Sequence, residues 1–273
     1  MIENRTKQLL RDGRTALGVW GLLSDPTTIE VAGIAGLDYV LVDMEHTARD
    51  IPTIEHMARA ADVVGIDLIV RVPDHSVATI QHVLETGATG IAVPHVDTAE
   101  EAARIVAAAR YPLGGERGVC SMSRAARFGA LRPRYAEYVE QANREILVIG
   151  LIETATGVAN IGAILDAGVE VAFVGRRDLS GSLGVHGAAE HPSVLAAQEK
   201  ILAAVAEREG SAWAGLVPYR DADGGDWRTD GATFLAYRND ISHLMEAYKE
   251  GVRLFKDPAA AASDRVAAGT GAA

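Results

Sequence analysis

Residues 146–178 read ILVIGLIETATGVANIGAILDAGVEVAFVGRRD, and this stretch decides the fold. Two short apolar runs, residues 146–152 and 169–175, flank an alanine-rich segment of helical length. An apolar run without polar alternation is typical of a strand that is buried on both faces of a parallel sheet. The stretch therefore predicts a β-strand, a crossover helix over residues 158–166 and a second β-strand, which together form one βαβ unit.

The same alternation recurs along most of the chain. Eight strands are predicted, at residues 16–20, 38–44, 67–72, 90–96, 146–153, 169–175, 211–217 and 232–238. Helices are predicted between them, at residues 27–35, 51–64, 77–86, 99–109, 158–166, 192–208 and 241–255. Eight such units in about 250 residues predict an α/β protein with a (β/α)8 TIM barrel. A doubly wound open sheet is the alternative, but no Gly-x-Gly-x-x-Gly motif follows an early strand, which disfavours a nucleotide cofactor.

Two segments interrupt this rhythm. Residues 111–129 form a long loop rich in glycine and arginine, and loops of this length in compact domains are frequently functional. Residues 220–231 are polar and replace the expected helix before the last strand. Because no shift in composition divides the chain, residues 1–256 are expected to form one barrel domain, and the Ala/Gly-rich residues 257–273 are expected to be disordered.

Composition narrows the class of protein. The formal net charge of −11 disfavours a nucleic-acid-binding surface. No apolar run approaches the length of a transmembrane helix, and residues 1–7 show no signal-peptide pattern, so no membrane partner is expected. The single cysteine, Cys120, excludes a disulfide within the chain, which favours a cytoplasmic protein.

Charged side chains gather at the predicted carboxyl ends of the strands, where TIM barrels carry their active sites. Glu153 and Asp178 follow the fifth and sixth strands, and a carboxylate there is costly to bury without a proton, a cation or a metal. Two hard oxygen ligands suit Mg²⁺ or Mn²⁺. The alternative interpretation is two helix caps or ion-paired acids. His46 and Arg71 occupy the same end of two further strands, which favours a site.

The positions of the four lysines disfavour one type of carbonyl chemistry. Lys7 and Lys256 lie near the termini, and Lys200 and Lys249 lie in predicted helices, so no predicted strand end carries a lysine. A Schiff-base aldolase needs a buried lysine amine at such a position, so this mechanism and a PLP enzyme are both disfavoured. A barrel that performs carbonyl chemistry without lysine needs a metal as its electron sink.

Five motifs, in this order and spacing, resemble the HpcH/HpaI family of metal-dependent pyruvate aldolases. They are Asp43-Met44-Glu45-His46, Arg71-Val72-Pro73, Gly118-Val119, Ile152-Glu153-Thr154 and Asp178-Leu179-Ser180-Gly181-Ser182-Leu183-Gly184. The resemblance implies a barrel of the phosphoenolpyruvate/pyruvate-domain type. It implies a class II aldolase, a carbon–carbon lyase that forms or cleaves the bond between a pyruvate-like enolate and an aldehyde. It also implies a homo-oligomer, commonly a hexamer.

The resemblance also assigns roles to single residues. Glu153 and Asp178 correspond to the ligands of the metal, which is usually Mg²⁺, Mn²⁺ or Co²⁺. His46 matches the histidine that performs acid/base work, and Asp43 matches the aspartate that orients it. Arg71 matches the arginine that stabilises the enolate oxygen.

The loop before the metal aspartate departs from the family pattern. In the family, the backbone amides of this loop hold the substrate carboxylate, and its sequence is usually Gly-Pro-x-Asp, whereas here it is Gly175-Arg176-Arg177-Asp178. Arg176 has two interpretations. It is either an anionic handle for a dicarboxylate or phosphorylated substrate, or a residue that points to solvent or to a neighbouring subunit.

Three other positions bear on the substrate. Leu151 replaces a glutamine that is common in the family, and Arg117 and Arg124 in the long loop are further candidates for binding the distal charge of the acceptor. Three functions stay open. The first is an aldolase that binds a 2-keto acid and an aldehyde. The second is the same metal site acting on a diacid such as oxaloacetate, by decarboxylation or by a citrate-synthase-like condensation. The third is a non-catalytic barrel that binds a keto acid.

Overall fold

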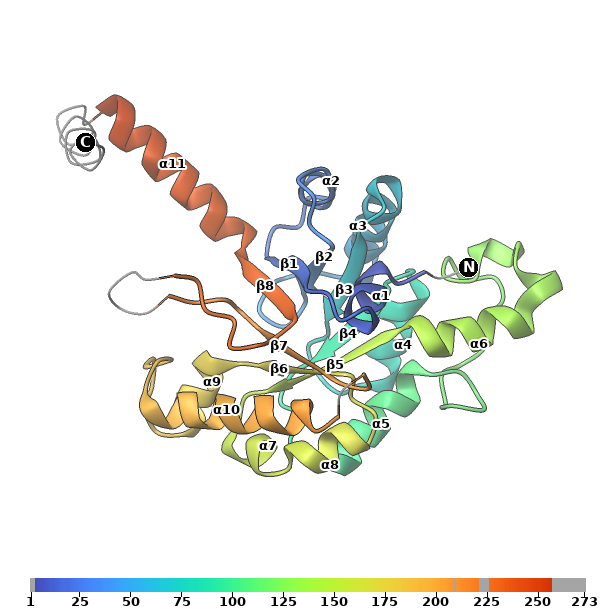
Figure 1. Cartoon of the computed structure of the whole chain (residues 1–273). Helices are drawn as coiled ribbons and strands as arrows, with labels where there is room; N and C mark the ends of the chain where they lie inside the picture. Colours follow the sequence, from blue (N-terminus) through green and yellow to red (C-terminus); the bar gives the residue numbers. More distant parts are fainter. Residues whose placement is uncertain (1–2, 209, 221–225, 257–273) are drawn as a thin grey trace.

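The computed structural model describes residues 3–208, 210–220 and 226–256 (Figure 1). Its eight parallel strands form a closed barrel in which each strand pairs with the next and β8 pairs with β1. The strands are β1 (Ala16–Gly21), β2 (Tyr39–Asp43), β3 (Asp67–Arg71), β4 (Gly90–Val93), β5 (Leu147–Ile152), β6 (Val171–Val174), β7 (Trp213–Leu216) and β8 (Phe234–Asn239). The predicted TIM barrel is therefore confirmed, and each predicted strand is present.

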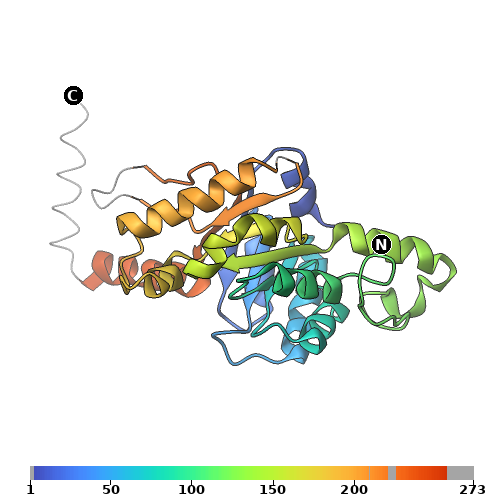
Figure 2. The same cartoon turned by 90° about the horizontal axis from the view of Figure 1, so that it is seen from below.

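One helix precedes β1, and the other helices follow the strands. The helices are α1 (Arg5–Arg11), α2 (Thr27–Ile34), α3 (Ile51–Val64), α4 (Val77–Glu85), α5 (Ala99–Ala109), α6 (Tyr135–Glu145), α7 (Ala155–Ala159), α8 (Ile161–Asp166), α9 (Arg176–Ser182), α10 (Pro192–Ala206) and α11 (Asp240–Lys256). Two views place α11 at the side of the barrel, far from α6 (Figures 1 and 2). In the described part of the chain, no helix combines the length and the apolar character that crossing a bilayer requires.

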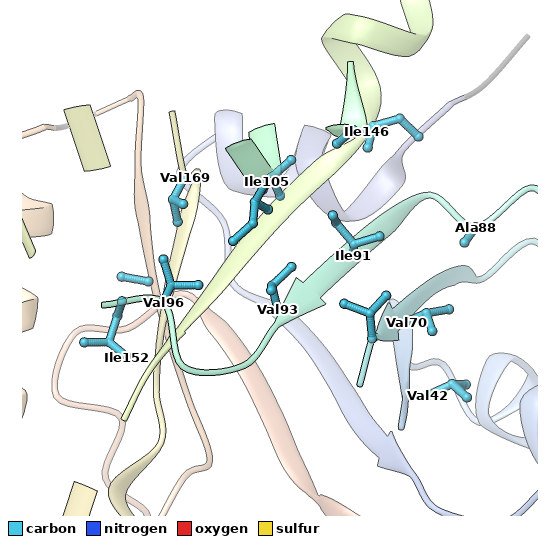
Figure 3. Close-up of a cluster of buried hydrophobic side chains, with 14 of the residues drawn as sticks. Val42, Val70, Ala88, Ile91, Val93, Val96, Ile105, Ile146, Ile152 and Val169 are labelled. Atoms are coloured by element: carbon cyan, nitrogen blue, oxygen red, sulfur yellow. The ribbon is translucent and has the colours of Figure 1, made fainter. Parts of the chain in front are cut away.

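The two-residue period of the strands divides their side chains between the barrel interior and the helices. In β2, Tyr39 and Leu41 pack inside the barrel, whereas Val42 packs in the outer layer beneath the helices. Figure 3 shows part of this outer layer, where Val93 of β4 and Ile105 of α5 lie among other valines and isoleucines. Because both faces of strands β2 to β6 are buried, these strands appear in the sequence as largely apolar runs.

The same period places charged side chains at the mouth of the barrel. Leu41 packs in the interior, and two residues further along β2 comes Asp43. Ile69 packs in the interior, and two residues further along β3 comes Arg71. In β5 the interior series leads in the same way to Glu153. Alternation along three strands therefore directs these charged residues to one place.

The opposite, amino-terminal end of the barrel is closed by α1, which the sequence analysis did not predict. Lys7 is buried, and its Nζ lies 2.6 Å from Glu170 Oε1 and 2.6 Å from the backbone oxygen of Arg144. Burial lowers the pKa of Lys7, and the charge of Glu170 opposes this effect. The buried residues of α1 are Thr6, Lys7 and Leu10, so no apolar stripe marks the helix in the sequence.

Other helices also differ from prediction. Helix α6 follows the long loop and was not predicted, because it buries only Tyr138 and Ala142. The short helix α9 was not predicted either. The helix that was predicted over residues 158–166 begins earlier and is divided at Asn160 into α7 and α8. None of these differences changes the order of the strands, which is what positions the site.

The polar segment 220–231 is not helical where the structure describes it, as predicted. Tyr219 and Arg228 form an antiparallel bridge, so the chain makes a hairpin between β7 and β8. Figure 1 shows this hairpin at the same side of the barrel as α9 and α10. Residues 221–225 and the tail 257–273, which was predicted to be disordered, lie outside the described residues.

Candidate active site

A cavity of about 380 Å³ lies at the carboxyl ends of the strands. Its charged and polar lining contains seven of the eight residues that the sequence analysis placed in the site: His46, Arg71, Glu153, Gly175, Arg176, Arg177 and Asp178. The eighth, Asp43, lies behind Arg71 and borders an adjoining cavity together with His46. The rest of the lining is mainly apolar: Trp20, Leu151, Phe173, Val174, Ala189 and Val217.

Glu153 is the buried carboxylate of this cavity, with an exposed fraction of only 2%. The backbone N–H of His95 donates to Glu153 Oε1 at 2.9 Å, and His95 Nδ1 lies 3.3 Å from the same oxygen. Burial raises the pKa of Glu153. The contacts with His95 oppose the rise, and the charges of Asp178 and Glu45 add to it. A bound cation would stabilise a carboxylate in these surroundings.

The residues next to Glu153 fit a divalent metal. A Cβ atom on Gly175 would lie 2.7 Å from Glu153 Oε2, so glycine leaves room for this carboxylate. Asp178 lies in the first turn of α9 and lines the same cavity. Among the described residues, no group of three or more His, Cys, Asp or Glu side chains could hold a metal. Two carboxylates suit Mg²⁺ or Mn²⁺, which keep positions for substrate oxygens and water.

Arg71 and Asp43 form a buried bidentate ion pair at the edge of the cavity. Arg71 Nε donates to Asp43 Oδ1 at 2.9 Å, and Arg71 Nη2 donates to Oδ2 at 2.6 Å. Burial acts to raise the pKa of Asp43, but the contacts with Arg71 hold it below its usual value. The guanidinium also lies 4.5 Å from the centre of the Trp20 ring, and its Nη1 lies 2.9 Å from Glu45 Oε2. These contacts fix the plane of the guanidinium.

The structure corrects the role that was expected for Asp43. Its carboxylate accepts the backbone N–H groups of Glu45 at 2.8 Å and His46 at 3.3 Å, and both of its oxygens are bound to Arg71. The His46 ring is 63% exposed, and its Nε2 lies 3.8 Å from Glu45 Oε2. Asp43 therefore positions the turn that carries His46, and does not contact the imidazole itself.

Glu45 is a site residue to which the sequence analysis gave no role. Its Oε2 is shielded from solvent, and the charged group that lies closest to it is Arg71 Nη1, at 2.9 Å. The Glu45 carboxylate faces two histidines, at 3.8 Å from His46 Nε2 and at 3.9 Å from His95 Nε2. His95 has a φ of 50°, which is uncommon for a residue other than glycine. Glu45 lies inside the quoted motif, but nothing in the sequence shows which way its side chain turns.

Arg176 lies in the cavity and not in solvent. Its side chain is half-buried, and its guanidinium carbon lies 3.6 Å from the centre of the Tyr219 ring. Arg177 is exposed at the rim, between this cavity and a neighbouring one that Arg238 borders. Leu151, which replaces the family glutamine, lines the cavity with its apolar side chain.

The prediction that two further arginines, Arg117 and Arg124, bind the acceptor was wrong. Arg117 is fully buried, and its Nη2 lies 2.8 Å from Glu85 at the end of α4. Arg124 pairs with Asp62 at 2.6 Å and donates to a backbone oxygen just after α4. The carboxyl ends of the helices meet the amino-terminal end of the barrel, so both arginines stabilise the fold on the side away from the cavity.

The closed barrel and the polar cavity at the carboxyl ends of its strands define a TIM-barrel enzyme. A family model described as HpcH/HpaI aldolase/citrate lyase matches residues 16–247, and the chain belongs to this family. The predicted family is therefore confirmed, and with it the prediction of a carbon–carbon lyase.

Known relatives cover nearly the whole chain. It is 35% identical over 254 residues to a 5-keto-4-deoxy-D-glucarate aldolase of Klebsiella pneumoniae, an alignment that covers 93% of this chain and 97% of the relative. A solved HpcH/HpaI aldolase/citrate lyase family protein from Burkholderia cenocepacia has a TM-score of 0.84 and 31% identity, with 93% and 100% of the two chains covered. The citrate synthase SbnG has a TM-score of 0.80 and 29% identity, with 93% and 98% covered.

Proposed function

We propose that the protein is a divalent-metal-dependent aldolase that acts on a pyruvate-like keto acid and an aldehyde. The observation that carries this proposal is the buried Glu153, which shares a cavity with Asp178, Arg71 and His46. The similarity to a 5-keto-4-deoxy-D-glucarate aldolase supports an acidic sugar derivative as the substrate class.

Glu153 and Asp178 would hold the metal, Mg²⁺, Mn²⁺ or Co²⁺. When it is bound, the ion polarises the keto group of the substrate. Arg71 presents a fixed positive charge where negative charge develops on the keto oxygen, and it needs no rearrangement because Asp43 and Trp20 already hold it. The backbone N–H groups of residues 175–178 would bind the substrate carboxylate.

His46 would move the protons of the reaction. In the cleavage direction, the base takes the proton of the hydroxyl group on C4, the C3–C4 bond breaks, the aldehyde leaves and a proton returns to C3. His46 lines the cavity, and Glu45 lies 3.8 Å from its Nε2, where a carboxylate can orient the ring. An imidazole suits this work because it can both accept and donate a proton near neutral pH.

The proposed function is tested by proton–deuterium exchange at C3 of pyruvate, followed by NMR in D₂O. We expect exchange with Mg²⁺ to be at least about 100-fold faster than exchange with EDTA, because proton transfer at C3 needs the metal and His46 but no aldehyde. Heat-inactivated protein with Mg²⁺ is the control. If a thermal shift shows that Mg²⁺ binds and C3 still does not exchange, pyruvate is not the donor.

The diacid function remains as a second candidate, because Arg176 lines the cavity and the citrate synthase SbnG is similar in sequence and fold. Oxaloacetate, acyl thioesters and 4-hydroxy-2-keto acids are compared in one panel. A higher kcat/KM for oxaloacetate than for every hydroxy-keto acid would reassign the reaction. Binding of metal and keto acid without any turnover would indicate a non-catalytic barrel.

We also propose that the protein is a homo-oligomer that assembles through α11. This helix projects from the barrel, and none of its described side chains is buried (Figure 1). Its exposed apolar residues recur at helical spacing: Ile241, Leu244, Met245, Tyr248, Val252 and Phe255. A large exposed apolar stripe is typical of an interface, and a second copy of the chain would cover it. The family resemblance implies six copies.

Light scattering after size-exclusion chromatography tests this assembly. The wild type is expected to have a multiple of the 28.8 kDa chain mass. The double variant Leu244→Glu/Tyr248→Glu is expected to have the mass of a single chain, because two unpaired charges are costly to bury in the interface. Glu250→Lys changes the charge on the opposite side of α11 and serves as the matched control. A wild type with the mass of one chain would refute the proposal.

A cytoplasmic location and small-molecule partners complete the proposal. Cys120 is free and exposed, which suits a reducing compartment. Cell fractionation tests the location, and recovery of the protein in an oxidising compartment would contradict it.

A further inference from the structure

We propose that Arg176 binds the carboxylate at the far end of a dicarboxylate substrate, which makes the enzyme selective for aldehydes that carry an acid group. This inference rests on the proposed function, since it places the keto-acid end of the same molecule at Glu153 and Asp178. It adds the recognition of the acceptor, which the metal site does not provide.

The first argument is the unbalanced charge of Arg176. The other inward-facing arginine, Arg71, is neutralised by Asp43 and Glu45. Arg176 forms no hydrogen bond or ion pair with any described residue, and its Nη1 is shielded from solvent without a partner. Because an unpaired group of this kind is costly to desolvate, a carboxylate ligand would stabilise it.

The electrostatic surroundings of Arg176 leave this charge in place. Asp230 accepts hydrogen bonds from Tyr219, Gln198 and Arg228, and it forms no ion pair with Arg176 in the described part of the chain. The cavity therefore keeps a guanidinium that no described carboxylate contacts directly.

The second argument is the support that holds the guanidinium. Arg176 stacks on Tyr219 at 3.6 Å from the ring centre. The Tyr219 hydroxyl donates to Asp230 Oδ2 at 2.6 Å, and Gln198 Nε2 donates to the same oxygen at 2.6 Å. Backbone hydrogen bonds of 3.2 and 2.7 Å join Tyr219 to Arg228 across the hairpin. A stacked guanidinium keeps its N–H edges free, which is the geometry that binds a carboxylate through two parallel hydrogen bonds.

The third argument is the position of Arg176 within the cavity. Residues two apart in a helix do not face each other, so Arg176 and Asp178 diverge although both begin α9. Arg176 turns to Tyr219 in the hairpin after β7, whereas Glu153 follows β5. The cavity between them holds about 380 Å³, the size range of small-molecule sites. A ligand anchored at the two carboxylates can therefore extend towards the guanidinium.

The test compares three acceptors with pyruvate as donor: succinic semialdehyde with a terminal carboxylate, glyceraldehyde 3-phosphate with a phosphate, and butanal with no charge. We expect Arg176→Gln to lower kcat/KM for succinic semialdehyde about 30- to 100-fold, mainly through KM, and to change the value for butanal less than about threefold. Arg176→Lys should restore only part of the loss, because an ammonium cannot form the paired contact.

Controls separate this inference from the proposed function and from misfolding. Arg220→Gln removes the same charge from an exposed position on the same hairpin, and it should leave kcat/KM unchanged for all three acceptors. Deuterium exchange at C3 of pyruvate needs no acceptor, so metal-dependent exchange that persists in Arg176→Gln shows that the variant is folded and keeps its keto-acid site. An equal loss for all three acceptors would overturn the inference while the aldolase proposal stands. A loss confined to the phosphorylated acceptor would overturn the assignment to a carboxylate.

Discussion

Glu153→Gln is expected to lower the aldol activity at least about 1000-fold, or about 4 kcal/mol in transition-state stabilisation, and yet to leave the metal-free protein as stable as the wild type or more stable. The two effects share one cause. Glu153 is 2% exposed and lies near the charges of Asp178 and Glu45, so without a metal its carboxylate is held at a cost. The amide fills the same space without that charge, but it is a poor ligand for a hard cation.

Three measurements together check this prediction: kcat at saturating Mg²⁺, the increase of the unfolding temperature on adding Mg²⁺ or Mn²⁺, and the free energy of unfolding in EDTA. Glu153→Gln should lose both kcat and the metal-dependent thermal shift, and it should keep the free energy of unfolding in EDTA. Glu199→Gln, on the exposed side of α10, is the matched control and should match the wild type in all three. A Glu153→Gln protein that keeps a tenth of the activity and the full thermal shift would show that Glu153 is not a metal ligand.

The fold and the place of Glu153 and Asp178 in the cavity could be predicted because both depend on local sequence. Strands β2 to β6 are buried on both faces, so their positions are visible from the run of apolar residues alone. Glu153, a proposed metal ligand, directly follows such a run, and the two-residue period decides that it belongs to the interior series of β5. Nothing beyond the strand and its end is needed for that inference.

Contacts between elements could not be predicted in the same way. Asp43 binds Arg71 because the register of β2 and β3 pairs these two residues, and no local pattern fixes a register between parallel strands. The prediction that Asp43 contacts the His46 ring was wrong for this reason. The stacking of Arg176 on Tyr219 likewise depends on a hairpin whose bridge joins residues nine positions apart (219 and 228), and Lys7 meets Glu170 only when the barrel closes.

Arg71→Met is expected to reduce both activity and stability, in contrast to the change at Glu153. We expect kcat to fall about 1000-fold, because the fixed positive charge beside the keto oxygen is lost. We also expect the free energy of unfolding to fall by about 3–5 kcal/mol at pH 7, because Asp43 is fully buried and loses its ion-pair partner. The pair is stabilising at that pH, since Arg71 holds the pKa of Asp43 low and the contribution is lost only as the pH falls through it.

A second substitution separates the two roles of Arg71. Arg71→Met combined with Asp43→Asn removes the stranded carboxylate, so urea unfolding should show that much of the lost stability returns. The activity should stay low, because the amide does not replace the charge at the substrate. Arg59→Met breaks an exposed ion pair with Glu55 on α3 and should cost less than about 1 kcal/mol, which makes it the matched control. If the double variant recovered activity together with stability, Arg71 would act only through the fold, and the charge beside the keto oxygen would have to come from another residue of the cavity.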